Sequence, residues 1–179
     1  GYVTDITTDM ALDWLDRWKT ATRQQTDEPF FLCLHHKAPH RPWEPGPNEK
    51  TLYEGETIPE PETLWDDYAG RPAAEAARMR VDQDLAQKDV KGTPPSDLSP
   101  CKRKRWYYDR YIKDYLRCVA GIDRNIGRVL DWLDQHHLSE QTLIVYTSDQ
   151  GFFLGDHGWY DKRFIYEHST RIPLIVRYP

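Results

Sequence analysis

The chain has 179 residues, of which 39% are hydrophobic and 30% are charged, and this composition predicts a globular domain with its own core rather than a disordered segment. Its net charge of -5 argues against a general attraction to nucleic acid or to an anionic membrane. No apolar run is long enough for a transmembrane helix, and the first ten residues do not resemble a signal peptide. Three cysteines are an odd number at spacings that fit neither a disulfide framework nor a zinc cluster.

Both ends of the sequence look cut. Gly1 begins about one turn before a helical pattern, and Pro179 follows directly after a predicted strand at residues 172–178. We therefore expect residues 1–179 to be a piece of a larger chain.

The first predicted helix begins at Thr8 and Asp9, with the hydroxyl as N-cap and the acid in the first turn, and ends near Lys19. Its apolar face comprises Ala11, Trp14, Leu15 and Trp18. Pro29 breaks the chain, and residues 30–34 form an apolar run of strand length.

An irregular middle follows. Residues 35–47 contain several prolines and are predicted to be a loop rich in histidine, lysine and arginine. Residues 48–106 are expected to be a Pro-rich and charged insertion, with a charged helix over residues 71–91 and a linker over residues 92–100.

The strongest periodic signal predicts one long amphipathic helix over residues 106–137. Its apolar positions are Tyr108, Ile112, Tyr115, Val119, Ile122, Ile126, Val129 and Leu133, and its tyrosines are predicted to lie in the core. Strands are predicted at residues 143–147 and 172–178. Strands that alternate with helices predict an α/β fold with a mostly parallel or mixed sheet flanked by helices.

Polar side chains gather directly after the strand at residues 143–147. Asp149 and Gln150 offer a carboxylate and an amide oxygen, which are hard ligands suited to Ca²⁺ or Mg²⁺. A two-zinc site is expected to use imidazole here, so Gln150 argues against it. A tight turn that needs Asp and Gly explains the same residues without a metal.

Cations form the second candidate cluster. Lys37, His40, Arg41 and Lys162 would be a local positive excess in an acidic chain, which suits a tetrahedral anion such as sulfate or phosphate. A lone loop histidine often has no such role. Trp43 could stack on a sugar ring or simply pack. The chain contains neither a Gly-x-Ser-x-Gly elbow nor a Gly-rich phosphate loop.

The last third of the chain, TSDQGFFLGDHGWYDKRFIYEHSTRIPLIVRYP, resembles the second signature half of the type I sulfatases, which belong to the alkaline-phosphatase superfamily. The segment FFLCLHHKAPHRPW is similar to the family's middle histidine segment. The stretches KAPHRPW and TIPEPETLWDDYAGR are similar to bacterial sulfatases assigned to 6-O-sulfated N-acetylglucosamine.

The resemblance implies an incomplete alkaline-phosphatase-like core and a role for each matching position. Asp149 and Gln150 would be ligands of one Ca²⁺ that residues outside this chain complete. His40 and Lys162 would be catalytic, with His40 near the leaving oxygen and Lys162 on the sulfate and bridging oxygens. The implied substrate-binding residues are Lys37, Arg41, Trp43 and His157. Residues 1–179 would then be part of a sulfatase catalytic domain that acts on a sulfated carbohydrate and is exported to the periplasm or the extracellular space.

The chain departs from the family at the nucleophile. The family makes a formylglycine within C/S-x-P/A-x-R, but Arg103 stands where Cys101 would need proline or alanine, and Cys118 lacks the arginine. In the family this motif and two further aspartate ligands lie N-terminal to the matching segment, so we expect residues 1–179 alone to be inactive. Two alternatives stay open: a phosphodiesterase or phosphonate monoester hydrolase of the same superfamily, and a sulfated-glycan binder without catalysis.

Overall fold

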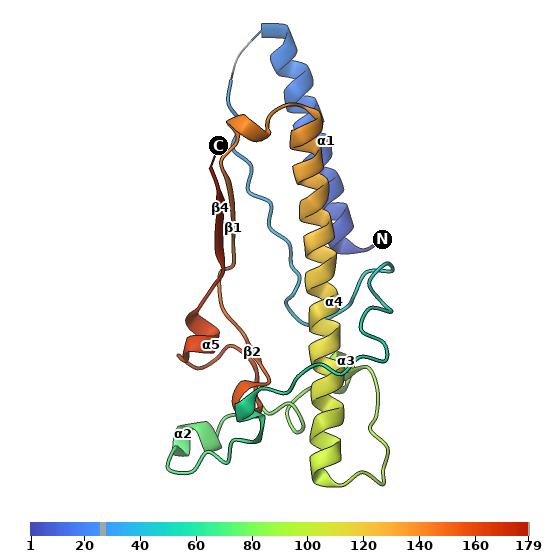
Figure 1. The fold of residues 1–179 in the computed structure, drawn as a ribbon, viewed down its shortest axis with the longest axis vertical. Coiled ribbons are helices and arrows are strands. Elements are labelled where there is room, and N and C mark those ends of the chain that lie inside the picture. Colours follow the sequence, from blue (N-terminus) through green and yellow to red (C-terminus); the bar gives the residue numbers. More distant parts are fainter. Residues whose placement is uncertain (26–27, 179) are drawn as a thin grey trace. The chain divides into compact units, whose positions relative to one another are not determined.

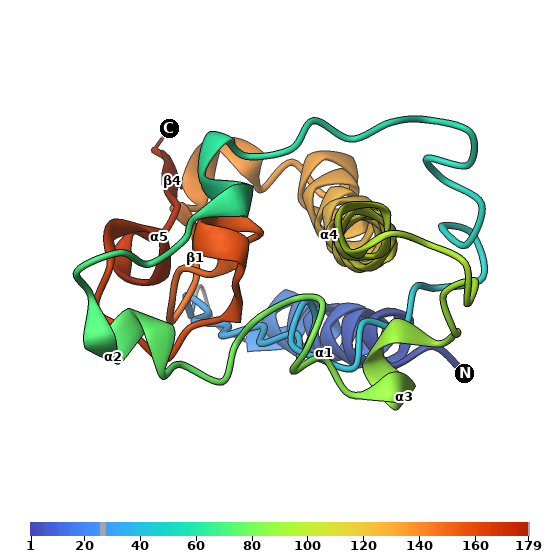
Figure 2. The ribbon, with the colours of Figure 1, turned by 90° about the horizontal axis from the view of Figure 1, so that it is seen from below.

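The computed structural model describes residues 1–25 and 28–178, which form two compact units. Unit 1 comprises residues 1–52 and 115–142, and unit 2 comprises residues 53–114 and 143–178. The longest helix, α4 (Pro100–Gln135), contributes its first part to unit 2 and its second part to unit 1 (Figure 1). Figure 2 shows this helix nearly along its axis.

Unit 1 is built on α1 (Val3–Gln25), which lies alongside the second part of α4 (Figure 1). Arg124 donates a hydrogen bond to Asp5 over 2.7 Å, and the indole of Trp132 donates to Asp16 over 2.8 Å. The residue numbers rise together along the two helices, so the helices run in the same direction. A short helical turn, η2 (Ser139–Gln141), follows α4.

The start and end predicted for the first helix are wrong. The helix begins at Val3 and continues to Gln25. Thr8 is fully buried inside it, and its hydroxyl donates to the Thr4 carbonyl over 3.0 Å instead of capping the helix. The predicted apolar face is confirmed at Ala11 and Leu15, which are buried. Packing against α4 extends the helix beyond the range that its local signals indicate.

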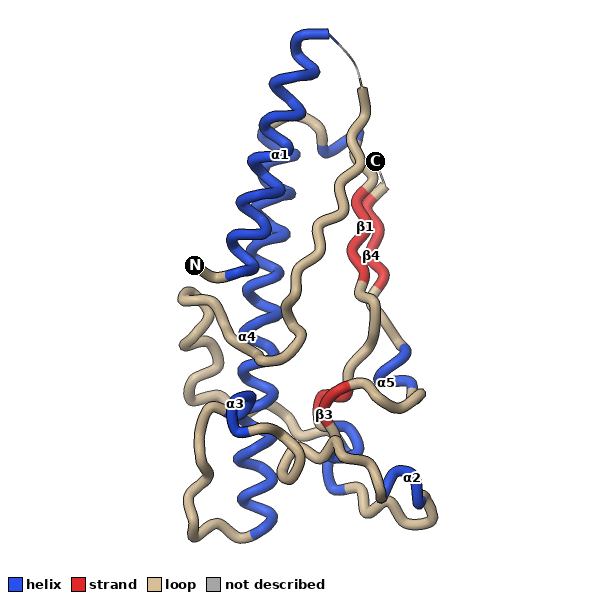
Figure 3. The backbone as a smooth tube through the Cα atoms, turned by 180° about the vertical axis from the view of Figure 1, so that it is seen from behind, coloured by secondary structure: helices blue, strands red, loops and turns tan. Residues whose placement is uncertain are grey.

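The strand predicted at residues 30–34 is also wrong, because this segment is a loop along its whole length (Figure 3). Its side chains alternate in burial as in a strand, and Phe31 is 88% exposed. A strand also needs a hydrogen-bonded neighbour. The described residues provide no ladder to this segment, and the ring of Phe30 at its start packs against Trp18 at 4.8 Å and Trp14 at 6.3 Å.

Helix α4 confirms the long amphipathic helix, although it begins six residues earlier than predicted. Ser99 supplies the start: its carbonyl accepts from the Arg103 amide over 2.8 Å, and its hydroxyl accepts from the Lys102 amide over 3.4 Å. Pro100 occupies the first helical position, where proline is favoured. The Ser-Pro pair was a usable signal inside the stretch that was predicted to be a linker.

Unit 2 contains two antiparallel ladders. β1 (Ile144–Thr147) pairs with β4 (Leu174–Arg177), and β2 (Phe153–Leu154) pairs with β3 (Tyr160–Asp161) (Figure 3). Both predicted C-terminal strands are therefore confirmed, while each ladder of the described residues is antiparallel rather than parallel. The remaining short elements of unit 2 are η1 (Glu62–Trp65), α2 (Pro72–Glu75), α3 (Gln87–Val90), η3 (Asp156–Gly158) and α5 (Glu167–Thr170).

An aromatic core joins the middle of the chain to the hairpin of β2 and β3. Tyr68 stacks on Trp159 with ring centroids 5.6 Å apart, and Phe153 meets Trp159 edge-on at 5.3 Å. The helix predicted over residues 71–91 is wrong, because only α2 and α3 form there. Residues 79–81 instead run beside β3: the Tyr160 amide donates to the Met79 carbonyl over 2.9 Å. These long-range backbone bonds outweigh the local helical preference.

Among the described residues, no helix is both long and apolar enough to cross a membrane.

Gly151 lets the chain after β1 pass against α5. Its amide donates to the Ser169 carbonyl over 3.0 Å. A Cβ at this position would lie 2.4 Å from the His168 carbonyl oxygen and 2.6 Å from that of Arg171. Both oxygens are backbone atoms, so moving them to make room for a Cβ would cost considerable free energy.

We predict that Gly151→Ala lowers the free energy of unfolding by at least about 2 kcal/mol, because overpacking against backbone costs this much. Gly127→Ala is the matched control. Nothing lies within 4 Å of a Cβ at Gly127, so the same change there should stabilise α4 by about 0.5–1 kcal/mol. Urea unfolding of both variants measures the difference, and equal stabilities would refute the close approach.

Candidate functional site

The predicted site residues belong to both units, and each set is described within its own unit. Unit 1 contains Lys37, His40, Arg41 and Trp43. Unit 2 contains Asp149, Gln150, His157 and Lys162.

In unit 1, a tight turn brings Lys37, His40 and Arg41 together. The His40 amide donates to the Lys37 carbonyl over 3.1 Å. The Arg41 carbonyl accepts two further bonds, from the Lys37 ammonium at 3.1 Å and from His40 Nδ1 at 2.9 Å. Because a carbonyl oxygen can only accept, the proton of the neutral His40 ring is on Nδ1. Nε2 of this exposed imidazole is therefore the atom available to a ligand.

His36 anchors this turn to α1, a role that the sequence did not indicate. Its Nε2 lies 2.9 Å from the hydroxyl of Thr8, 28 positions away in sequence. That hydroxyl uses its one proton on the Thr4 carbonyl, so it accepts the bond from His36. Burial lowers the pKa of His36, because the charged form is less well solvated there. A neutral, fixed His36 thus positions the segment that carries His40.

Trp43 is fully buried, with 0% of its surface exposed. A ring that stacks on a sugar must present a face to solvent, and this ring presents none. Of the two roles that the sequence left open for Trp43, the structure favours packing.

In unit 2, Asp149 and Gln150 lie directly beyond the end of β1, and both are exposed. The Ser148 hydroxyl donates to the Gln150 carbonyl over 2.8 Å and shapes the turn. Gly151 then fixes the turn against α5. Within residues 1–25 and 28–178, neither the Asp149 carboxylate nor the side-chain amide of Gln150 forms a hydrogen bond. Two adjacent and uncommitted oxygen ligands fit a calcium ion, although they fill only part of its coordination shell.

A complete metal cluster is absent from the described part of the chain. No group of three or more His, Cys, Asp or Glu side chains there could hold an ion. Any ion at Asp149 and Gln150 would therefore need ligands from elsewhere.

Lys162 follows directly after β3. The register of the hairpin pairs Phe153 with Asp161, so the next step places Lys162 opposite Phe152. Its ammonium is 5.9 Å from the centroid of the Phe152 ring. Lys162 is half-buried and forms no ion pair with any described residue. The hairpin thus places a cation without an ion pair beside Phe152, two residues after Gln150 in the sequence.

His157 is held firmly in the loop between β2 and β3. Its Nδ1 lies 2.6 Å from Asp66 Oδ2, a contact between residues 91 positions apart. Its amide donates to the Thr63 hydroxyl over 3.0 Å, and its carbonyl accepts from the Tyr68 hydroxyl over 2.6 Å. Its ring also lies 5.2 Å from that of Tyr166. Only Nε2 of the ring remains for a ligand. His157 thus has a clear structural role, and its contact with substrate stays a prediction.

Asp66 was not predicted from the sequence, although the loop depends on it. Its carboxylate accepts hydrogen bonds from Arg71, from the Tyr68 amide at 2.9 Å and from His157. The Arg71 guanidinium is the largest cause that holds the pKa of Asp66 well below its usual range. No short-range spacing in the sequence joins Asp66 to His157, so no local signal could have found the pair.

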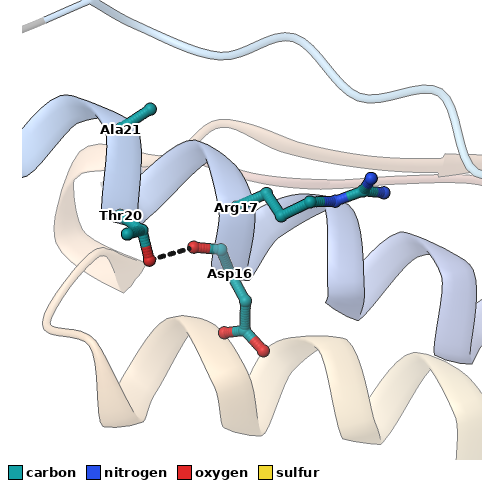
Figure 4. A pocket seen from close by; sticks show the side chains of 4 residues that line it. All are labelled: Asp16, Arg17, Thr20 and Ala21. Carbon is teal, nitrogen blue, oxygen red and sulfur yellow. Dashed lines mark hydrogen bonds between the residues drawn. The ribbon is translucent and has the colours of Figure 1, made fainter.

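A shallow depression on α1 is lined by Asp16, Arg17, Thr20 and Ala21 (Figure 4). The Thr20 hydroxyl bonds the Asp16 carbonyl over 2.8 Å, one turn earlier in the same helix. None of the predicted site residues lines this depression.

We predict that Asp66→Asn lowers the free energy of unfolding by about 2 kcal/mol at pH 7, because it removes charged hydrogen bonds to Arg71 and His157. The lowered pKa adds stability only above the unfolded carboxyl pKa of about 4, so the gap between the two proteins should shrink as the pH falls below that value. Asp67→Asn is the control, since its bond to the Ala69 amide can be made by asparagine. Chemical unfolding at several pH values provides the measurement, and an unchanged gap at low pH would contradict the role of the charge.

Comparisons with known proteins agree on one family. The sulfatase family model matches residues 1–179. The chain is 37% identical to an N-acetylglucosamine-6-O-sulfatase of Bacteroides thetaiotaomicron, over 100% of the chain and 38% of that protein. It is 29% identical to human iduronate 2-sulfatase, over 96% of the chain and 30% of that protein. The chain thus spans about two fifths or less of the length of these relatives.

Comparison with solved structures finds the same fold in related hydrolases. The structure of BT4656 in complex with its substrate D-glucosamine-2-N,6-O-disulfate matches 100% of this chain and 43% of its own, with a TM-score of 0.88 and 36% identity. A phosphonate monoester hydrolase from Silicibacter pomeroyi matches with a TM-score of 0.70 and 26% identity, over 99% of this chain and 33% of its own. These matches confirm the predicted alkaline-phosphatase-like α/β core. The chain belongs to the sulfatase family.

Proposed function

We propose that the whole protein hydrolyses the 6-O-sulfate ester of N-acetylglucosamine in a sulfated glycan, through a formylglycine outside residues 1–179. The observation that carries this proposal is the half-buried Lys162, which has no acidic partner among the described residues and lies 5.9 Å from the ring of Phe152, the second residue after Gln150. The relative named N-acetylglucosamine-6-O-sulfatase, which aligns with the entire chain, supports this choice of substrate. We further propose a periplasmic or extracellular location, which rests on the resemblance alone.

Lys162 and His40 have chemistry that suits this reaction. An ammonium group that no carboxylate neutralises can bind the sulfate oxygens and stabilise the charge that develops as the ester bond breaks. His40 donates its Nδ1 proton to the Arg41 carbonyl, so its second ring nitrogen, Nε2, is not used by this bond. When the ring is protonated, Nε2 can donate a proton to the leaving sugar oxygen.

We also propose that Asp149 and Gln150 hold one calcium ion together with ligands from the rest of the protein. Their oxygen atoms are exposed and adjacent, and Gly151 fixes the turn that presents them. When bound, the ion would neutralise part of the charge of the sulfate group. Lys37 and Arg41 would add positive charge for anion binding near His40.

Steady-state kinetics of the whole protein tests the role of Lys162. We expect release of sulfate from 6-O-sulfated N-acetylglucosamine, and a loss of about 100-fold or more in kcat/KM for Lys162→Ala, as for removal of a group that stabilises transition-state charge. Lys88→Ala, which removes an exposed lysine of α3, should leave kcat/KM unchanged. Full activity of Lys162→Ala would overturn the assignment.

Metal analysis separates the sulfatase from the runner-up. Similarity to the phosphonate monoester hydrolase keeps a phosphodiesterase or phosphonate hydrolase as the second candidate. We expect one calcium per whole protein and a loss of calcium in Asp149→Ala, measured by elemental analysis. Two zinc or manganese ions per protein, with turnover of phosphonate esters instead of sulfate esters, would favour the second candidate.

A further inference from the structure

Helix α4 carries four consecutive basic residues near its start, in a chain of net charge -5. Lys102, Arg103, Lys104 and Arg105 lie within its first two turns, and the first turn contains no acid. The amino end of a helix carries a partial positive charge, so acids are favoured there and bases are not. The positive charge at this end of α4 therefore does not stabilise the helix.

Most of this charge is not neutralised by neighbouring acids. Lys102 and Arg103 are exposed, and neither has an ion pair with a described residue. Arg103 donates to the Tyr107 hydroxyl over 3.2 Å and lies 5.4 Å from the centroid of its ring. Both contacts are neutral, so they orient the guanidinium without cancelling its charge. Arg105 bonds Glu60 over 2.7 Å, yet its side chain is still 60% exposed.

An exposed tryptophan makes these cations part of an ordered surface. Trp65 is 41% exposed, and its ring centroid lies 5.2 Å from the Lys104 ammonium and 5.4 Å from the Arg105 guanidinium. Its indole donates to Glu60 over 3.1 Å, so the same carboxylate holds Trp65 and Arg105. Burial lowers the pKa of Lys104, while Asp82 nearby acts in the opposite direction. The uncompensated charge therefore resides mainly on Lys102 and Arg103.

This surface borders the loop between β2 and β3 in unit 2. The Lys104 ammonium lies so close to Gly158 that a Cβ there would be 2.7 Å from it. Gly158 precedes β3, and Lys162 follows β3. The positive surface at the start of α4 thus borders the same hairpin that carries Lys162.

We propose that residues 102–105 and Trp65 form a binding surface for the continuing chain of a sulfated polysaccharide, outside the site where the ester is cleaved. The proposal rests on the proposed function for the identity of the ligand. Four residues span only about 6 Å of helix, so the surface can contact only a short stretch of a polyanion. Proteins that bind DNA commonly neutralise 6–10 phosphates, so a patch this short in an acidic chain favours the glycan over nucleic acid.

Heparin is a suitable probe because it is a sulfated chain. The whole protein is compared with the double variant Lys102→Gln/Arg103→Gln and with the control Lys50→Gln/Lys88→Gln, which removes the same charge at exposed lysines elsewhere. We expect the first variant to bind heparin about tenfold more weakly and the control to bind like the wild type. We also expect kcat/KM to fall for a sulfated polymer but not for the sulfated monosaccharide.

Three outcomes would overturn the proposal: equal heparin affinities of the two double variants, tighter binding of duplex DNA than of heparin at the same salt concentration, or unchanged turnover of the polymer. Thermal unfolding should show no loss of stability in either variant, because the substituted side chains are exposed. If the monosaccharide is not hydrolysed but heparin binding falls only in the Lys102/Arg103 variant, the proposed function fails while the binding surface stands.

Discussion

The carboxylate of Asp66 is the constraint on which the hairpin of unit 2 depends. It joins Arg71, the Tyr68 amide and His157, and so ties the middle of the chain to the loop between β2 and β3. Three hydrogen bonds on one carboxylate stabilise its charged form, which is the reason for its lowered pKa. The charged carboxylate thus holds the loop through His157. That loop fixes the start of β3 and, with it, the position of Lys162.

Close backbone packing adds the second fixed point. Gly151 brings the chain after β1 within hydrogen-bonding distance of α5, where any side chain would meet carbonyl oxygens. The turn before it can then present Asp149 and Gln150 to solvent while its own backbone is satisfied. The polar residues that follow β1 thus have a physical explanation. Gly151 permits the close approach of the two backbone segments. The side chains of Asp149 and Gln150 take no part in holding the turn.

The sequence predicted best what local periodicity controls. The apolar repeat of α4 and the strands at β1 and β4 were found because each is encoded by neighbouring residues. The strand at residues 30–34 failed because a strand also needs a partner, which composition does not show. The site residues came from a resemblance in motif rather than from periodicity. The Asp66–His157 pair and the anchor between His36 and Thr8 join distant positions, and no local pattern encodes such contacts.

The cations of this acidic chain fall into two classes, and the division separates structural from functional candidates. Arg124 forms ion pairs with Asp5 and Glu49, and Arg71 forms one with Asp66, so these charges are neutralised within the fold. Within the described residues, Lys162 has no such partner and is half-buried. Partial burial of an unpaired charge costs free energy, which an anionic ligand can recover. A sulfate ester is such an anion, which is consistent with the role that we propose for Lys162.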